Sequence, residues 1–487
     1  MPPKPAPSRV RLRMYRVGFG DCFLLTFEYA APLADGRSAR HVLIDFGSTS
    51  LARGQSSLVP VAKQINTHTN GGELDVVVVS HRHRDHLSAF AVPEIAKLLA
   101  KEGYPKLVVR SWTENPRARS ESRGRRGVAA GDEEAAMGRR SAKFLRTLDE
   151  AEAFGAILED RTKTASGRSL AATVHRMAFG QLKNEAAVTQ LKSWSKDGRG
   201  SYVFYGKPSR IEEVVPGIKV HVLGPPTIDQ YPAVARQRSR DADEFWQLYQ
   251  GLARGLSPAD FGLDLDADEP FGAPGDASSE ESMAAEPDPA ALEAPMPRQK
   301  VGDPGPVRWL TDQLSRQQVN SLLRIVRILD DVLNNTSVIL LFEVPGARPL
   351  KLLFPGDAQI ENWEYALKVV KEKERDANLD LLRNIDLYKV GHHGSRNATP
   401  RTLFNLWSDP TADPPHPMTG VMSTKANVHG ESPATAVPRK TLVAALDTRM
   451  FPNFYSTQSL TSKEAFYELV ADLSTTTGFQ RVMGPGI

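Results

Sequence analysis

The sequence predicts a layered α/β fold, with strands dominating both ends of the chain and helices between them. Continuous apolar runs, such as the four valines at 76–79, are typical of strands buried on both faces. Segments with apolar residues at helical spacing separate these runs. Ligand-type side chains directly follow several of the strands, so we expect the chemistry to lie at strand-to-loop transitions.

The first hundred residues contain four expected strands and one expected helix. Apolar runs bounded by turn residues predict strands at 10–18, 21–29, 40–47 and 74–81. Apolar positions at helical spacing predict a helix at 91–103.

The middle of the chain is weakly patterned, as is typical of an insertion. We expect helices at 131–154 and 187–197 and a strand at 218–226. A further expected helix at 241–256 leads into 260–297, which is rich in Pro, Ala, Ser and acidic residues and contains no Lys or Arg. That last segment is expected to be disordered because it has too little apolar surface to bury.

The last third of the chain returns to strands. A strong i, i+3, i+4, i+7 apolar pattern first predicts a helix packed on the core at 319–334. Strands are then expected at 336–344, 350–357, 385–395 and 419–425, followed by a helix at 438–446.

These elements divide the 487 residues into halves of one domain separated by insertions. We expect the N-terminal half of the domain at 1–114 and a basic, partly helical insertion at 115–215. A strand of the core follows at 216–230, then a helix plus disordered acidic linker at 231–305, and the C-terminal half at 306–487.

Composition indicates a cytoplasmic protein. No apolar run approaches the roughly 20 residues that span a bilayer, and the N-terminal stretch lacks the apolar core of a secretory signal. The single cysteine, Cys22, excludes an internal disulfide and a cysteine-based zinc cage. Any metal must therefore be held by histidine and carboxylate.

Charge is balanced overall, at +3, but unevenly distributed. The segment 116–126 carries five arginines against one glutamate, whereas 260–297 is acidic. A solvated basic loop and a passive acidic tether are the simplest interpretations. A further hypothesis is that the acidic segment shields a basic groove until a partner displaces this segment or a protease cuts it.

A cluster of ligand-type side chains follows the valine strand. His81, His83, Asp85 and His86 lie within six consecutive positions, and alternate residues of an extended chain share a face. Imidazole and carboxylate groups are ligands of zinc. A lone histidine beside a strand is usually structural, but four such groups together predict a metal site.

The H-x-H-x-D-H pattern resembles the second motif of the metallo-β-lactamase-fold hydrolases, and further marks appear in the family's order. Asp45 in "HVLIDFG" resembles the first motif, a strand-end aspartate that braces the metal loop. Asp357 in "LLFPGDA" resembles the carboxylate that bridges two metals, and "KVGHHGSRN" resembles the last histidine motif. The resemblance implies an αββα sandwich with helical and disordered insertions.

Finer marks are similar to the ComEC-type branch, named after the membrane protein of DNA uptake. These marks are "VGFGDCFLL", "NNTSVILLFE", "LLFPGDA" and "KVGHHGSRNATP". The chain lacks the membrane helices of that protein and resembles a free-standing, soluble version of its hydrolase module.

The resemblance implies two divalent ions, zinc or manganese, and a set of site residues. The implied metal ligands are His81, His83, Asp85, His86, Asp357 and one or both of His392 and His393. The candidate catalytic residues are Asp85, His86, His393, Lys425 and His429, and the candidate substrate-binding residues are Asp21, Ser395, Arg396 and Asn397. For Ser395, Arg396 and Asn397, simple turn chemistry is an equal alternative.

One family histidine is missing. Asn334 or Asn335 stands in its place, and an amide oxygen is a poor zinc ligand, although harder ions accept it. His175 and His221 are alternatives from elsewhere in the chain, although each on its own is better explained as structural. The first metal site, with His81 and His83, is therefore expected to be the weaker one.

The expected function is a metal-dependent phosphodiesterase that cleaves DNA with a metal-activated water. Its restraint by the acidic segment would suit a dormant toxic nuclease, as in a defence system. Hydrolysis of a small phosphodiester or ester is one alternative, because the fold hosts many substrates. A non-catalytic binding or regulatory module is the other.

Overall fold

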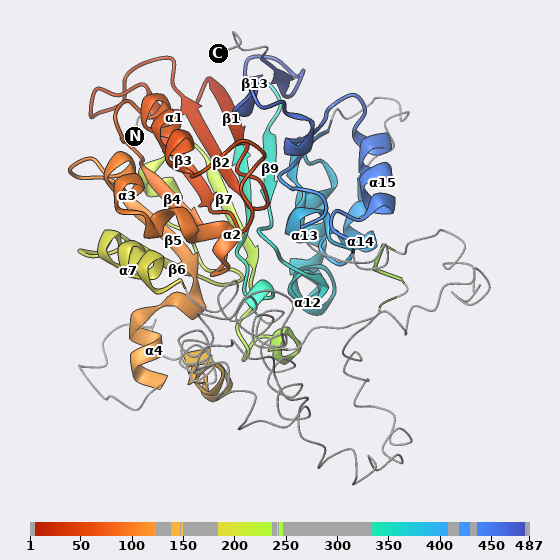
Figure 1. Cartoon of the computed structure of the whole chain (residues 1–487). Coiled ribbons are helices and arrows are strands. Elements are labelled where there is room, and N and C mark those ends of the chain that lie inside the picture. The colour runs from red at the N-terminus through yellow and green to blue at the C-terminus, as the bar shows by residue number, and fades with distance from the viewer. Residues whose placement is uncertain are drawn as a thin grey trace, which may run out of the picture.

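The structure of the chain is a computed structural model (Figure 1). The described residues are 5–122, 138–146, 148–149, 184–235, 241, 243–246, 333–407, 418–428 and 436–482. The expected acidic segment 260–297, most of the expected helices at 241–256 and 319–334, and the candidates His175 and His429 lie outside them.

Eight strands form the first sheet, which is antiparallel at one side and parallel at the other. In spatial order they are β14 (Gln480–Arg481), β13 (Phe466–Asp472), β1 (Arg9–Tyr15), β2 (Cys22–Glu28), β3 (Ala39–Phe46), β4 (Val76–Val79), β5 (Leu107–Ser111) and β6 (Gly200–Val203). The pairs from β3 to β6 are parallel, so the carboxyl ends of these strands lie at one edge. The antiparallel β2 begins at that same edge, where Cys22 pairs with Phe46.

Six strands form the second sheet. Their order is β12 (Phe454–Ser456), β11 (Thr419–Met422), β10 (Leu387–Lys389), β9 (Leu350–Phe354), β8 (Ile339–Val344) and β7 (Lys219–Gly224). The pairs from β9 to β12 are parallel, while β7, β8 and β9 pair antiparallel. This sheet therefore also presents several carboxyl ends at a single edge.

The two sheets share one apolar core. Alternate residues of β4 show how it is built, because Val76 and Val78 pack in the core with side chains of the second sheet. Phe354 of β9 contacts Phe23 of β2 across the interface, with ring centroids 5.9 Å apart. Val77 and Val79 face the opposite way, into a separate apolar cluster.

Helices cover the outer face of each sheet (Figure 1). Apolar side chains of α1 (Val59–His68), α3 (Pro93–Leu99) and α7 (Glu185–Trp194) pack on the first sheet. Those of α12 (Ile360–Glu364), α13 (Glu372–Arg383), α14 (Arg401–Phe404) and α15 (Lys440–Met450) pack on the second. The short helices α2 (Arg84–Leu87), α4 (Pro116–Ser122) and α8 (Ile211–Val214) lie in connections between strands.

The α/β class expected from the sequence is confirmed. The structure adds elements that were not expected, among them α1 and the strands β5, β12, β13 and β14. It also differs in the middle of the chain, because β6 pairs with β5 and α7 packs on the first sheet. Residues 185–203, which the sequence assigns to the insertion, thus contribute to the eight-stranded sheet. Their strand is only four residues long and contains Gly200 and Ser201, so it carries little apolar pattern. No helix in the described ranges is long and apolar enough to cross a membrane.

Candidate metal centre

The candidate centre lies where the carboxyl ends of strands from both sheets meet. Asp45 is the penultimate residue of β3, and the 81–86 segment follows β4 after Ser80. From the second sheet, Asp357 follows β9 and His393 follows β10. Each side chain is thus fixed by a buried strand, which is a rigid support for a constellation of ligands.

Asp45 braces the loop that carries the histidines. Its Oδ1 accepts the Ser80 backbone N–H at 2.7 Å, and its Oδ2 accepts the Ser80 hydroxyl at 2.7 Å. Oδ2 also lies 2.8 Å from His86 Nδ1. Asp45 adopts a left-handed backbone conformation with φ of 55°, which turns its side chain back toward this loop. The contact fixes the His86 ring, so that its other nitrogen, Nε2, faces the centre.

Two glycines allow the backbone to pack tightly around α2. A Cβ atom on Gly20 would lie 2.7 Å from the Asp85 carbonyl oxygen, and one on Gly47 would lie 2.4 Å from that of Arg84. The close approach lets the Asp21 backbone N–H donate to the Asp85 carbonyl at 2.9 Å. The turn before β2 therefore holds the helix that carries Asp85 and His86.

Asp85, His86, Asp357 and His393 bring their ligand atoms within 4.8 Å of one another. His86 Nε2 lies 3.1 Å from Asp357 Oδ2, and His393 Nε2 lies 3.1 Å from Asp85 Oδ2 and 3.6 Å from Asp357 Oδ2. His86 and His393 are fully buried, whereas Asp85 retains 8% of its exposure. The cluster is accordingly most open on the side of Asp85.

The structure places His393, and not its neighbour, in the cluster. The His393 ring is oriented by the Ser423 carbonyl oxygen, 2.9 Å from Nδ1, and by Phe19, whose ring centroid is 4.3 Å away. His392 contributes its backbone N–H, which donates to Asp357 Oδ1 at 3.1 Å, and its side chain is half-buried. Both residues have positive φ, of 42° and 51°, so the turn aims the two rings differently.

His81 and His83 lie beside this cluster. Nε2 of His81 and Nδ1 of His83 are 2.8 Å apart, and the His81 ring centroid is 4.2 Å from that of His86. The two side chains share a face, as alternate residues of an extended segment do. Burial, together with neighbouring His86 and His83, lowers the pKa of His81 well below its ordinary value. His81 is therefore neutral, which is the form that binds metal.

A buried lysine lies behind the cluster. Lys389, at the end of β10, is 2% exposed, and its Nζ lies 2.5 Å from Asp21 Oδ2. The same Nζ donates to the Gly356 carbonyl oxygen at 3.0 Å and lies 3.4 Å from Asp357 Oδ1. Burial opposes its charge, but Asp21 and Asp357 raise the pKa of Lys389 above the ordinary value, so it is a permanent cation.

Charge interactions set the protonation states in the metal-free protein. Burial opposes protonation of His86, but Asp357, Asp45 and Asp85 together raise its pKa well above the ordinary value. Asp357 and Asp21 likewise raise the pKa of His393 against the effect of burial. Burial opposes ionisation of Asp357, but the positive charge of His86, His393 and Lys389 lowers its pKa well below the usual range. The two imidazoles thus act as the cations that a bound ion would replace.

The donor set fits a divalent ion. Two carboxylates and two imidazole nitrogens are the ligand types that zinc and manganese accept. Each imidazole is oriented through its other nitrogen by an oxygen, from Asp45 for His86 and from Ser423 for His393. This support fixes the ring tautomer and direction, as is usual around metal-ligating histidines.

The other candidates from the sequence lie around the cluster or away from it. Asp21 is fully buried beneath Lys389, and Lys425 donates to Ser50 Oγ at 2.8 Å and to the Leu51 carbonyl at 2.6 Å. His221 lies 3.0 Å from Glu343 on the neighbouring strand, which agrees with a structural role.

The polar residues after His393 make local contacts. The Ser395 hydroxyl donates to Asn397 Oδ1 at 3.0 Å, as in a turn. The Arg396 guanidinium lies 5.8 Å from the centre of the Phe245 ring. Asn334 and Asn335 are buried, and the Asn335 amide lies 3.4 Å from Glu361 Oε2.

Sequence reasoning missed two residues of the centre, Lys389 and Ser80. A lysine between apolar residues in the strand "LYKV" is the signal that could have found Lys389, because a fully buried lysine requires a carboxylate partner. Ser80 carries no such signal, because a serine at the end of a strand is common.

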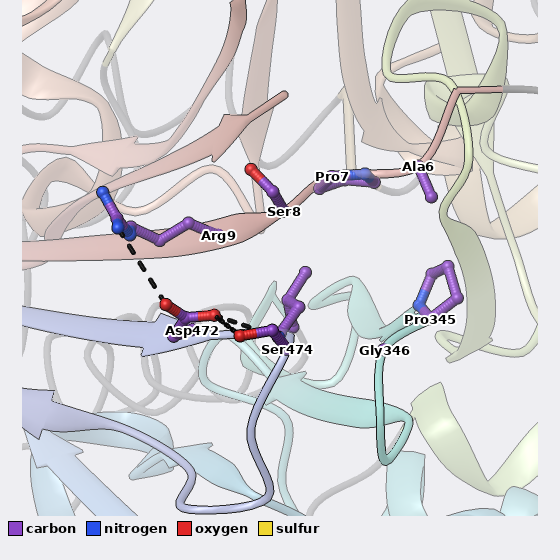
Figure 2. A pocket seen from close by; sticks show the side chains of 9 residues that line it. Ala6, Pro7, Ser8, Arg9, Pro345, Gly346, Asp472 and Ser474 are labelled. Carbon is purple, nitrogen blue, oxygen red and sulfur yellow. Dashed lines mark hydrogen bonds and ion pairs between the residues drawn. The ribbon is translucent and has the colours of Figure 1, made fainter. Parts of the chain in front are cut away.

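One surface depression lies away from the candidate metal centre (Figure 2). It has a volume of about 420 Å³ and lies between the start of β1 and the end of β13, where Arg9 faces Asp472. The candidate metal centre is at the opposite end of β1, so this depression is not part of it.

The comparisons with known proteins give no family. No family model matches the chain, and no curated protein matches it.

Metal binding is expected to release protons. His86 and His393 have raised pKa values, so the positively charged imidazolium form of both is favoured in the metal-free protein. A metal ion must displace the proton from Nε2 of each ring in order to bind there. Affinity should therefore keep increasing with pH beyond about 6.5, where a histidine of ordinary pKa would already have lost its proton. Calorimetry of Mn²⁺ binding in buffers of different ionisation enthalpy measures the release. Binding without proton release would contradict these protonation states.

The substitution Asp45→Asn should weaken metal binding about 10- to 100-fold, the usual cost of losing a group that orients a ligand. Asparagine has a similar shape and accepts positive φ, but its amide is a weaker acceptor for the Ser80 and His86 donors. Asp376→Asn, in an exposed position of α13, is the matched control. Equal Mn²⁺ affinity of the two variants would show that Asp45 does not orient His86.

Proposed function

We propose that this chain is a metal-dependent hydrolase that cleaves phosphodiester bonds, with DNA as its substrate. The observation that carries the proposal is the convergence of Asp85, His86, Asp357 and His393 within 4.8 Å at the ends of strands from two sheets. Structural sites seldom bury so many ionisable groups together, whereas catalytic metal sites do.

The arrangement of the sheets supports a specific fold assignment. Two sheets share a core and carry helices on both outer faces, as in the αββα sandwich of the metallo-β-lactamase fold. The motifs around Asp45, 81–86, Asp357 and His393 resemble those of that family in order and in position after strands. We therefore assign the chain to that fold as part of the proposal.

The candidate residues would have different roles in metal binding. Asp85, His86, Asp357 and His393 would hold the second of two ions, and His81 and His83 would contribute to a first site that is weaker because Asn334 or Asn335 replaces a histidine. Divalent ions supply a water of lowered pKa and offset the charge of the phosphodiester. The buried surroundings of His86 and His393 exclude bulk water from the ligands, and Asp45 keeps the His86 ring directed inward.

The choice of DNA rests on two observations. The motifs are similar to the ComEC-type branch, whose hydrolase module is associated with DNA degradation. In the arginine-rich segment 116–126, which begins in α4, Arg119 is paired with Asp149 inside the protein. The other arginines of the segment would provide phosphate contacts that bind nucleic acid without sequence preference. His429 and Lys425 remain candidates for contacts with the phosphate.

A cleavage assay tests the proposal. The purified chain with added Mn²⁺ or Zn²⁺ should cut plasmid or single-stranded DNA, and Asp85→Asn should lower the rate at least about 1,000-fold because it removes a ligand of the metal. Asp447→Asn, on the exposed face of α15, is the matched control and should retain full activity. RNA and a chromogenic phosphodiester belong in the same series.

Ready turnover of the small ester without cleavage of any nucleic acid would overturn the assignment of the substrate. A metal content below one equivalent that does not change in the double variant Asp85→Ala/His86→Ala would overturn the metal-dependent hydrolase. That second result would favour a binding or regulatory module.

A further inference from the structure

The two oxygens of the Asp357 carboxylate have different surroundings. Oδ2 faces the imidazoles, 3.1 Å from His86 Nε2 and 3.6 Å from His393 Nε2. Oδ1 faces away from them, 3.1 Å from the backbone nitrogen of His392 and 3.4 Å from Lys389 Nζ. One oxygen is thus directed at the ligand cluster, and the other is held by donors of the protein.

Lys389 is itself fixed in place. Its ammonium group lies 2.5 Å from Asp21 Oδ2 and donates to the Gly356 carbonyl at 3.0 Å, one residue before Asp357. Asp21 is in turn tied to α2 through its backbone N–H and the Asp85 carbonyl. The lysine therefore connects the turn before β2, the turn after β9 and the end of β10, and burial leaves its side chain little room to move.

We propose that Lys389 is a positioning residue that keeps Oδ1 of Asp357 away from the metal, so that Asp357 binds through Oδ2 alone. The inference deepens the proposed function and rests on its metal centre. A carboxylate can bind an ion through one or both oxygens, and a second oxygen would take an additional coordination position. By holding Oδ1, Lys389 and the His392 amide leave that position open for water or substrate, which catalytic metal sites require.

The simpler alternative is that Lys389 only neutralises the buried Asp21. Removal of the lysine alone cannot separate the two roles, because it would also leave Asp21 as an unpaired buried charge, which is strongly destabilising. The double variant Asp21→Asn/Lys389→Met removes both charges together. It tests the position of Asp357 in a protein without an uncompensated anion.

Co²⁺ is a suitable probe because its visible absorption depends on coordination number and geometry. Metal-free full-length protein would be loaded with Co²⁺ in four forms: wild type, Lys389→Met, Asp21→Asn/Lys389→Met, and the control Lys351→Met. Lys351 is on the neighbouring strand β9, and its Nζ donates to the Asp380 carbonyl at 3.5 Å at the surface.

Wild type and Lys351→Met should share one spectrum. Both variants without Lys389 should still bind Co²⁺, but their visible absorption per bound ion should be at least about twofold weaker. The released Oδ1 would join the coordination shell, and Co²⁺ with more ligands absorbs visible light more weakly. A purely structural lysine would not change this spectrum in the charge-neutral double variant.

Identical spectra in all four forms would overturn the proposal and leave the metal centre intact. Loss of Co²⁺ binding in the folded double variant would also overturn it, because a released oxygen adds a donor. Failure of the wild-type protein to bind Co²⁺ would instead overturn the metal centre on which the proposed function rests.

Discussion

The site depends on the burial of four carboxylates at one edge of the two sheets. They belong to Asp21, Asp45, Asp85 and Asp357. Each is at most 8% exposed, and a buried charge is costly unless it is paired or hydrogen-bonded. Each carboxylate has partners. Asp45 contacts Ser80 and His86, Asp21 contacts Lys389, and Asp85 contacts His393. Asp357 contacts His86 Nε2 and accepts the His392 backbone N–H. In the proposed function, a divalent ion would supply further positive charge at this edge.

The architecture of the sheets makes this concentration of charge feasible. Parallel strands end at a common edge, so β3 and β4 of one sheet and β9 and β10 of the other deliver side chains to the same place without long loops. Glycines at 20 and 47 remove the Cβ atoms that would separate the turns from α2. The apolar core between the sheets then holds the strand ends rigidly.

Much of the candidate site could be predicted from the sequence because its ligand-type side chains lie close to strand ends. His81 to His86 follow "VVVV", and Asp357 and His393 follow apolar runs that the structure shows as β9 and β10. The choice between His392 and His393 could not be predicted, because it depends on two positive φ values in one turn. The buried position of Lys389 could be inferred from "LYKV", but its carboxylate partners Asp21 and Asp357 are distant in sequence and could not. The pairing of β6 with β5 was missed because these strands are also distant in sequence.

The most direct test of the account is the position of a bound ion. Anomalous diffraction from crystals of the full chain soaked in Mn²⁺ should show a peak bounded by Asp85, His86 Nε2, His393 Nε2 and Asp357 Oδ2, with Asp357 Oδ1 still directed at Lys389. A second, weaker peak beside His81 and His83 would agree with the weaker first site. The contrary result would be Mn²⁺ at full occupancy elsewhere in the protein, with no peak between these four side chains and no change in their positions. It would contradict the claim that they form a metal site.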